Sequence, residues 1–216
     1  MLSNVSFTVR LAEVLGLIGP NGAGKTTLFE CLAGLMPSRG AVKNGDQLLT
    51  EAVRKEVLFY FPDAITPWAD QTLKWVLKFF ERLYDQPHQK TATLVESLRL
   101  ESLTKARLST LSKGERKRAM LALSLLTPHP VLLLDEPFDG LDLRQTRDAM
   151  QLVRAEAGSG RTLMLSIHQL VDAGRVCDRL VLLNNGKLGG EGTLADLRVQ
   201  AGLNEGGLEE IFLALT

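Results

Sequence analysis

The sequence predicts an α/β fold built on a mostly parallel sheet. A glycine-rich run at residues 19–27 lies between an apolar strand pattern and a helix pattern. Apolar strand-like runs then return late in the chain, as VLLLD at 131–135, TLMLSI at 162–167 and RLVLL at 179–183. Strands that alternate with helices are typical of a parallel sheet covered by helices.

In the first third of the chain, strands are expected to dominate residues 5–61. The apolar run at 14–18 suits a buried strand, and the leucine spacing in 26–35 predicts a helix. Glycines at both ends of 40–45 bracket a turn and a short strand, and VLFYF at 57–61 reads as a continuous apolar strand.

Helical periodicity replaces strands in the middle of the chain. One helix is expected over 73–83, another near 95–98, and a third contains 119–126. The apolar face expected of the first is formed by Leu73, Val76, Phe79, Phe80 and Leu83. Later, a helix is expected at 143–156, and Asn185-Gly186 predicts a hairpin and hence an antiparallel addition to the sheet.

These patterns define one domain over residues 1–216. Its α/β core is expected to comprise residues 1–62 and 127–216, and a helical subdomain is expected to occupy 63–126.

The run GPNGAGKTT at 19–27 fits the phosphate-loop pattern G-x-x-x-x-G-K-[ST]. A strand, a glycine turn and a helix direct backbone N–H groups at one small space that suits a phosphate. Lys25 is expected to reach the β- and γ-phosphates, and the Thr26 hydroxyl to hold Mg²⁺. The alternative is a simple glycine-rich turn before a helix. The expected nucleotide contacts are Gly19, Pro20, Asn21, Gly22, Ala23, Gly24, Lys25, Thr26 and Thr27.

Two carboxylates end the strand pattern VLLLDE. Acids at the carboxyl edge of a buried strand suit a ligand site there. Asp135 is expected to organise Mg²⁺, and Glu136 to accept a proton from an attacking water. The alternative for Glu136 is a helix-cap or surface acid, because Pro137 follows it.

The segment LSKGE at 111–115 contains a second signal. Ser112 and Glu115 fit a capping box ahead of an apolar helical stretch. A plain capped helix does not explain Gly114, because glycine in a helical turn costs about 1 kcal/mol relative to alanine. It does allow a ligand to approach the backbone closely.

In this order and spacing, GPNGAGKTT, LSKGE, LLLDEP, FDGLD at 138–142 and SIH resemble an ABC-type ATPase over nearly the whole chain. The resemblance implies a phosphate-loop (RecA-like) core, ATP and Mg²⁺ as cofactors, and two such subunits that sandwich two ATP molecules. LSKGE corresponds to the family signature, so Ser112, Gly114 and Glu115 are expected to face the γ-phosphate bound by the other subunit. His168 resembles the family's switch histidine, at the sheet edge that also carries Asp135.

The chain departs from the family pattern at several positions. Asp63 stands where glutamine is usual, and it is expected to bind Mg²⁺ or to position water. Lys113 replaces a glycine and Glu115 a glutamine, while Ala12 occupies the place of a common turn glycine. Met1 falls about where the second strand of such domains begins. The first strand and the aromatic residue that stacks on adenine in the family are therefore not found in this sequence. Two explanations stay open: the true start lies upstream, or another group holds adenine.

The composition of the chain gives no sign of a nucleic-acid-binding, secreted or membrane-spanning protein. The chain of 216 residues has 25 basic and 25 acidic residues, so no basic excess favours a nucleic-acid partner. Cys31 and Cys177 are far apart in sequence and are expected to be isolated buried thiols of a reducing compartment, not a disulfide or a metal site. No secretory signal is evident, and the longest uncharged stretch, residues 119–134, is shorter than the ~20 residues of a membrane span.

The sequence thus predicts an ATP-hydrolysing subunit that powers transport, with export favoured, through a separate membrane-spanning subunit. It is expected to be cytoplasmic, at the inner face of the membrane, and to form a homodimer or heterodimer. The tail at 208–216 resembles that of exporters of the ABC-2 type, although an amphipathic helix fits equally well. Trp68 is expected to be an interface anchor or a core residue. The alternatives are a weakly active regulatory half that needs another partner, and a soluble clamp ATPase unconnected with transport.

Overall fold

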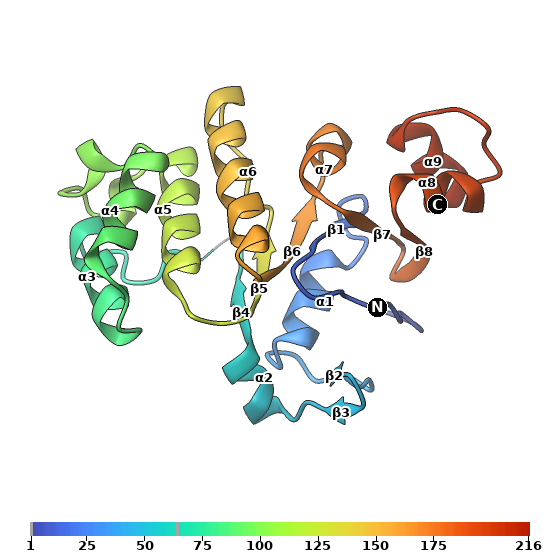
Figure 1. The fold of residues 1–216 in the computed structure, drawn as a ribbon, viewed down its shortest axis with the longest axis horizontal. Coiled ribbons are helices and arrows are strands. Elements are labelled where there is room, and N and C mark those ends of the chain that lie inside the picture. Colours follow the sequence, from blue (N-terminus) through green and yellow to red (C-terminus); the bar gives the residue numbers. More distant parts are fainter. Residues whose placement is uncertain (1, 64) are drawn as a thin grey trace.

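The computed structural model describes residues 2–63 and 65–216, and it contains a six-stranded sheet in the order β4-β5-β6-β1-β7-β8 (Figure 1). Five strands are parallel, and β8 pairs with β7 in the antiparallel sense. This arrangement confirms the predicted fold class. The strands are β1 (Val14–Ile18), β4 (Leu58–Phe61), β5 (Val131–Asp135), β6 (Thr162–Ile167), β7 (Arg179–Asn184) and β8 (Lys187–Gly192).

The central strands are apolar because helices cover both faces of the sheet. Every residue of β1 and β6 is buried. The helix α1 (Lys25–Leu32) follows β1 and packs Phe29 against Leu15 and Leu17. The helix predicted over 26–35 ends at Leu32, because Gly34 adopts a left-handed conformation with φ 74° that closes the helix.

The expectation that strands dominate residues 5–61 is wrong for part of that range. The predicted short strand is present as one arm of a hairpin, β2 (Lys43–Asn44) and β3 (Gln47–Leu48). However, α2 (Glu51–Val57) precedes β4 and takes Val57 from the predicted strand. Thr50 caps α2 by accepting from the Val53 N–H. Because no residue of α2 is buried, it carries no apolar periodicity that could reveal it.

The chain between β4 and β5 is helical. It contains α3 (Leu73–Leu83), α4 (His88–Ser97) and α5 (Lys113–Leu126), with short 3₁₀ turns at Glu101–Leu103 and Leu108–Thr110. These helices gather at the end of the molecule opposite β8 (Figure 1). The face predicted for α3 is only partly correct. Leu77 is buried in addition to Leu73, Val76 and Phe80, whereas Phe79 and Leu83 are exposed.

The C-terminal part returns to the sheet. The helices α6 (Leu143–Gly158), α7 (Leu170–Val176), α8 (Leu194–Gln200) and α9 (Leu208–Leu215) alternate with or follow the last strands. Asn185 and Gly186 form the predicted hairpin between β7 and β8, with φ values of 49° and 75°. Both cysteines are free, as predicted, but they are half-buried and not buried. Within the described part of the chain, no helix has the length and apolar character needed to cross a membrane.

Candidate functional site

The phosphate loop (residues 19–27) connects β1 to α1. Its first glycine is required by close packing, since a Cβ on Gly19 would overlap the main-chain oxygen of Leu183. Gly24 adopts a left-handed φ of 104° immediately before α1, so residues 25–27 of the loop form the first turn of that helix. The N-terminus of α1 therefore faces the hollow of the loop, where N–H groups and the helix dipole favour an anion.

Lys25 is held inside this loop. Its side chain is only 7% exposed, and Nζ donates to the Gly19 main-chain oxygen at 2.7 Å. Nζ also lies 3.7 Å from Glu136 Oε1. The ammonium is thus oriented toward the carboxylate that the sequence assigns to water activation.

Four oxygen-bearing side chains meet at the carboxyl edge of the sheet. Asp135 is 3% exposed, and one of its oxygens, Oδ2, accepts from Thr26 Oγ1 at 2.8 Å and from the Tyr60 hydroxyl at 3.4 Å. Ser166 donates to Oδ1 of the same carboxylate. Burial and the negative charge of Asp135 raise the pKa of Tyr60, which stays a hydrogen-bond donor at physiological pH.

The donor set around Asp135 suits Mg²⁺. This ion takes oxygen ligands, and it commonly uses one or two protein groups together with phosphate oxygens and water. Among residues 2–63 and 65–216, no group of three or more His, Cys, Asp and Glu side chains could hold a metal ion. Thr26 and Asp135 offer one hydroxyl and one carboxylate. This small number of protein ligands suits a Mg²⁺ ion that a bound nucleotide also holds.

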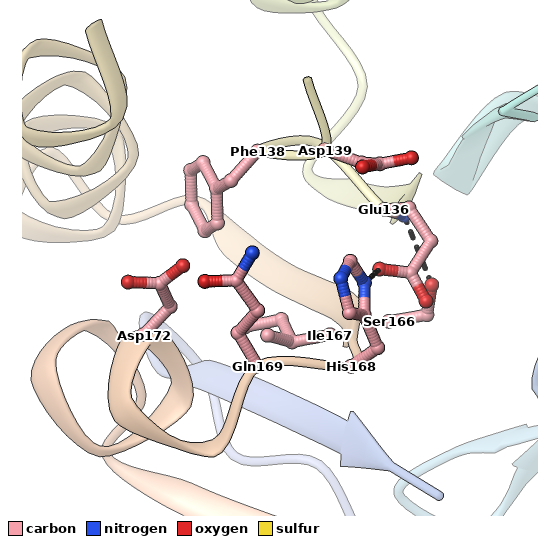
Figure 2. A pocket seen from close by; sticks show the side chains of 8 residues that line it. All are labelled: Glu136, Phe138, Asp139, Ser166, Ile167, His168, Gln169 and Asp172. Carbon is pink, nitrogen blue, oxygen red and sulfur yellow. Dashed lines mark hydrogen bonds and ion pairs between the residues drawn. The ribbon is translucent and has the colours of Figure 1, made fainter. Parts of the chain in front are cut away.

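Glu136 and His168 lie together beside this cluster (Figure 2). His168 Nδ1 is 2.7 Å from Glu136 Oε2, and the Glu136 backbone N–H donates to Ser166 Oγ at 2.9 Å. Glu136 has a φ of 49°, a left-handed conformation that costs a non-glycine residue about 1–2 kcal/mol. Strain of this kind persists where surrounding contacts hold a side chain in a functional position.

The signature segment (residues 111–115) starts α5. The predicted capping box is present: the Ser112 N–H donates to Glu115 Oε2 at 2.8 Å, and the Glu115 N–H donates to Ser112 Oγ at 3.4 Å. The backbone hydrogen bond from Ser112 lowers the pKa of Glu115. Among the described residues, no hydrogen bond or ion pair joins Ser112 or Glu115 to the phosphate loop of the same chain.

The signature segment instead contacts residues 138–142 of its own chain. Lys113 Nζ pairs with Asp139 Oδ2 at 2.5 Å, and this hydrogen bond raises the pKa of Lys113. A Cβ on Gly114 would lie 2.6 Å from the Gly140 main-chain oxygen. Packing within the chain therefore favours glycine at position 114, in addition to the close ligand approach that the sequence suggests.

Replacing Gly114 with alanine is expected to lower the free energy of unfolding by about 1–3 kcal/mol, because the added methyl group overlaps a backbone oxygen. Urea unfolding followed by circular dichroism measures the change. Gly158→Ala is the matched control, since a Cβ at this helical position meets open space. Equal unfolding midpoints for Gly114→Ala and the unaltered chain would show that the close approach costs nothing.

Asp63, which is expected to bind Mg²⁺ or to position water, lies just after β4. Its carboxylate is paired with Lys117 Nζ, and that ammonium also donates to the main-chain oxygen of Asp135 at 3.1 Å. Among the described residues, no contact joins Asp63 directly to the Asp135 carboxylate or to Thr26.

Sequence reasoning assigned no role to four individual residues of this region. They are Tyr60, Lys117, Asp139 and Ser166, which contact Asp135 or the signature segment. One signal was available for Ser166. The runs VLLLD and TLMLSI both end in a polar residue, and the parallel register pairs Asp135 with Ser166. Lys117 gave no signal, because a lysine in a helix usually faces solvent.

Comparison with known proteins agrees with this geometry. The ABC transporter family model matches residues 2–139, more than half of the chain. The ABC-type transporter ATP-binding protein EcsA of Bacillus subtilis (strain 168) is 30% identical over 223 residues, which cover 100% of this chain and 90% of EcsA. The Nod factor export ATP-binding protein I of Ralstonia nicotianae is 34% identical over 197 residues, covering 87% of this chain and 60% of that protein.

A solved structure of the ATP-binding subunit of an ABC transporter superposes with a TM-score of 0.88 at 32% identity, covering 99% of this chain and 92% of that one. The family match, the phosphate loop and the acids at the edge of the sheet agree. The chain belongs to the ABC transporter family, as an ATP-binding domain whose ATP hydrolysis is coupled to transport.

Proposed function

We propose that this chain pairs with a second ATPase subunit, closes around ATP and Mg²⁺, and drives a membrane-spanning exporter from the cytoplasmic face of the membrane. The contact between Glu136 and His168, beside the buried Asp135 and the phosphate loop, carries this proposal. These groups provide a proton acceptor, its hydrogen-bond partner and a metal-binding carboxylate within one small region.

We assign each residue of the site a role from its position relative to the phosphate loop and the Asp135 carboxylate. Glu136 accepts the proton of an attacking water, and His168 holds the Glu136 carboxylate and contacts the γ-phosphate end of the nucleotide. Lys25 turns from the Gly19 oxygen toward the β- and γ-phosphates. Thr26 and Asp135 hold Mg²⁺, which neutralises phosphate charge when bound. Asp63 pairs with Lys117, so only Thr26 and Asp135 are proposed as the protein ligands of Mg²⁺.

The second subunit is proposed because the signature segment is separate from the phosphate loop of its own chain. Ser112, Gly114 and Glu115 present a capped helix N-terminus, and α5 is long enough for its dipole to favour a phosphate. We propose that these residues meet the nucleotide held by the other subunit.

The membrane partner is proposed to contact the helical segment formed by residues 63–126. On α3, Trp75 and Phe79 stack with ring centroids 5.5 Å apart, and both are exposed, as is Leu83. Lys78 and Arg82 line the same surface groove. Trp68 is 42% exposed and packs on Phe79 and Phe80, so it joins this surface to the core. Export is proposed because one relative is named for Nod factor export.

Light scattering of a Glu136→Gln variant tests the closure. Glutamine keeps the side-chain shape but cannot accept the proton, so bound ATP persists and the closed form accumulates. We expect a monomer without nucleotide and a dimer with Mg-ATP. ATP without Mg²⁺ serves as the control.

A variant that binds ATP but remains a monomer would contradict the homodimer, and it would require a different second subunit. A variant that binds no ATP would contradict the proposed mechanism for this chain.

A further inference from the structure

Lys117 is a buried cation at the junction of three elements. It lies in the second turn of α5, and its side chain is 6% exposed. Its ammonium contacts Asp63, just after β4, and the main-chain oxygen of Asp135, the last residue of β5. One side chain therefore connects the signature helix, the metal-site strand and the segment that leads into the helical block.

The burial of Lys117 explains the need for Asp63. A buried ammonium is strongly disfavoured unless a carboxylate and further acceptors satisfy it. Asp63 is the carboxylate that does so among the described residues, and it is 42% exposed. A neutral glutamine, which the family resemblance puts at this position, could not supply the same charge.

The two sides of Asp135 have different partners. Thr26, Tyr60 and Ser166 surround its carboxylate, where Mg²⁺ is proposed to bind. Lys117 instead contacts the main-chain oxygen. Asp63 therefore makes its direct contact on the main-chain side of β5, through Lys117, and among the described residues no hydrogen bond joins it to the Asp135 carboxylate.

We infer that Asp63 and Lys117 form a positioning pair, in which Asp63 acts through Lys117 and not as a metal ligand. The pair fixes the main chain at Asp135 relative to α5, and it ties the segment after β4 to the same point. A displacement of the helical segment (residues 63–126) at Asp63 is therefore transmitted through the Lys117 ammonium to the end of β5, where Asp135 and Glu136 lie. The catalytic part of this inference rests on the proposed function, whereas the pairing itself does not.

The experiment compares Asp63→Asn, Lys117→Met and the double variant with the unaltered chain. Hydrogen–deuterium exchange of residues 62–68 is expected to increase in all three variants, because each loses the tie to α5. The kcat for ATP is expected to fall about tenfold in each single variant, the lower end of the range for partners that orient metal-binding groups. The kcat of the double variant is expected to lie no more than about twofold below the kcat of the less active single variant.

Magnesium dependence separates positioning from metal binding. The Mg²⁺ concentration that gives half-maximal ATP binding by calorimetry is expected to stay within about twofold in Asp63→Asn. A rise of tenfold or more in that variant, with no rise in Lys117→Met, would make Asp63 a metal ligand and overturn the inference. Unchanged exchange at residues 62–68 in both single variants would also overturn it.

The control is a second ion pair away from the nucleotide site. Arg99 pairs with Asp148 of α6 at 2.8 Å, and Arg99→Met is expected to leave both kcat and the exchange of residues 62–68 unchanged. If Lys117→Met does not fold, the neutral Lys117→Gln replaces it, and Asp63→Asn still tests the pair. Failure of the unaltered chain to bind ATP would contradict the proposed function alone, because the exchange measurement still decides the pairing.

Discussion

Replacing Glu136 with glutamine is expected to lower ATP turnover by about 100- to 10,000-fold, the range that removal of a general base covers. Glutamine has nearly the same shape and still reaches His168, which lies 2.7 Å from the Glu136 carboxylate. ATP affinity is therefore expected to change little. Steady-state phosphate release and equilibrium ATP binding measure the two quantities separately.

The interpretation of that loss depends on two comparisons. Glu205→Gln, at an exposed position in the loop before α9, is the charge-matched control and is expected to retain full turnover. His168→Ala combined with Glu136→Gln is expected to lose little more than Glu136→Gln alone, because the two side chains form one unit. Strictly multiplicative losses would show that His168 and Glu136 act independently.

Lys25→Met is expected to reduce kcat/KM for ATP by about 100- to 1000-fold, the usual effect of removing one preorganised donor from developing charge. The substitution removes the ammonium near Glu136 but keeps the apolar stem that fills the buried space. ATP turnover over a range of nucleotide concentrations gives the value. Lys105→Met, at an exposed position outside the phosphate loop, is the matched control.

Thermal unfolding of Lys25→Met distinguishes a functional loss from a structural one. Lys25 Nζ donates to the Gly19 oxygen, so a modest change in melting temperature is expected when it is removed. Turnover close to that of the unaltered chain would contradict the role of Lys25 at the phosphates.

Much of the fold follows from local patterns in the sequence. The buried strands β1, β5, β6 and β7 are continuous apolar runs, and Asn185-Gly186 has the left-handed conformations of a two-residue hairpin turn. The phosphate loop is equally local, since its strand, glycines and helix are consecutive. Such elements are predictable because neighbours in sequence determine them.

The features that escaped prediction depend on tertiary contacts. No apolar stripe marks α2, because both of its faces are accessible to water. Phe79 has the spacing of a core residue, yet it stacks on Trp75 at the surface. The charge of Lys117 gives no hint that its side chain is buried, since its partners Asp63 and Asp135 are 54 and 18 positions away in the sequence.

The contacts between the signature segment and residues 138–142 join two segments that are separated in sequence by α5 and β5. The chain runs from α5 through β5 and then returns to the start of α5, where Lys113 meets Asp139 and Gly114 touches the backbone at Gly140. A force applied at the first turn of α5 is therefore transmitted to residues 138–142 by direct contact, without passing along the helix and the strand. We therefore expect the signature segment and residues 138–142 to shift together when either of them is displaced.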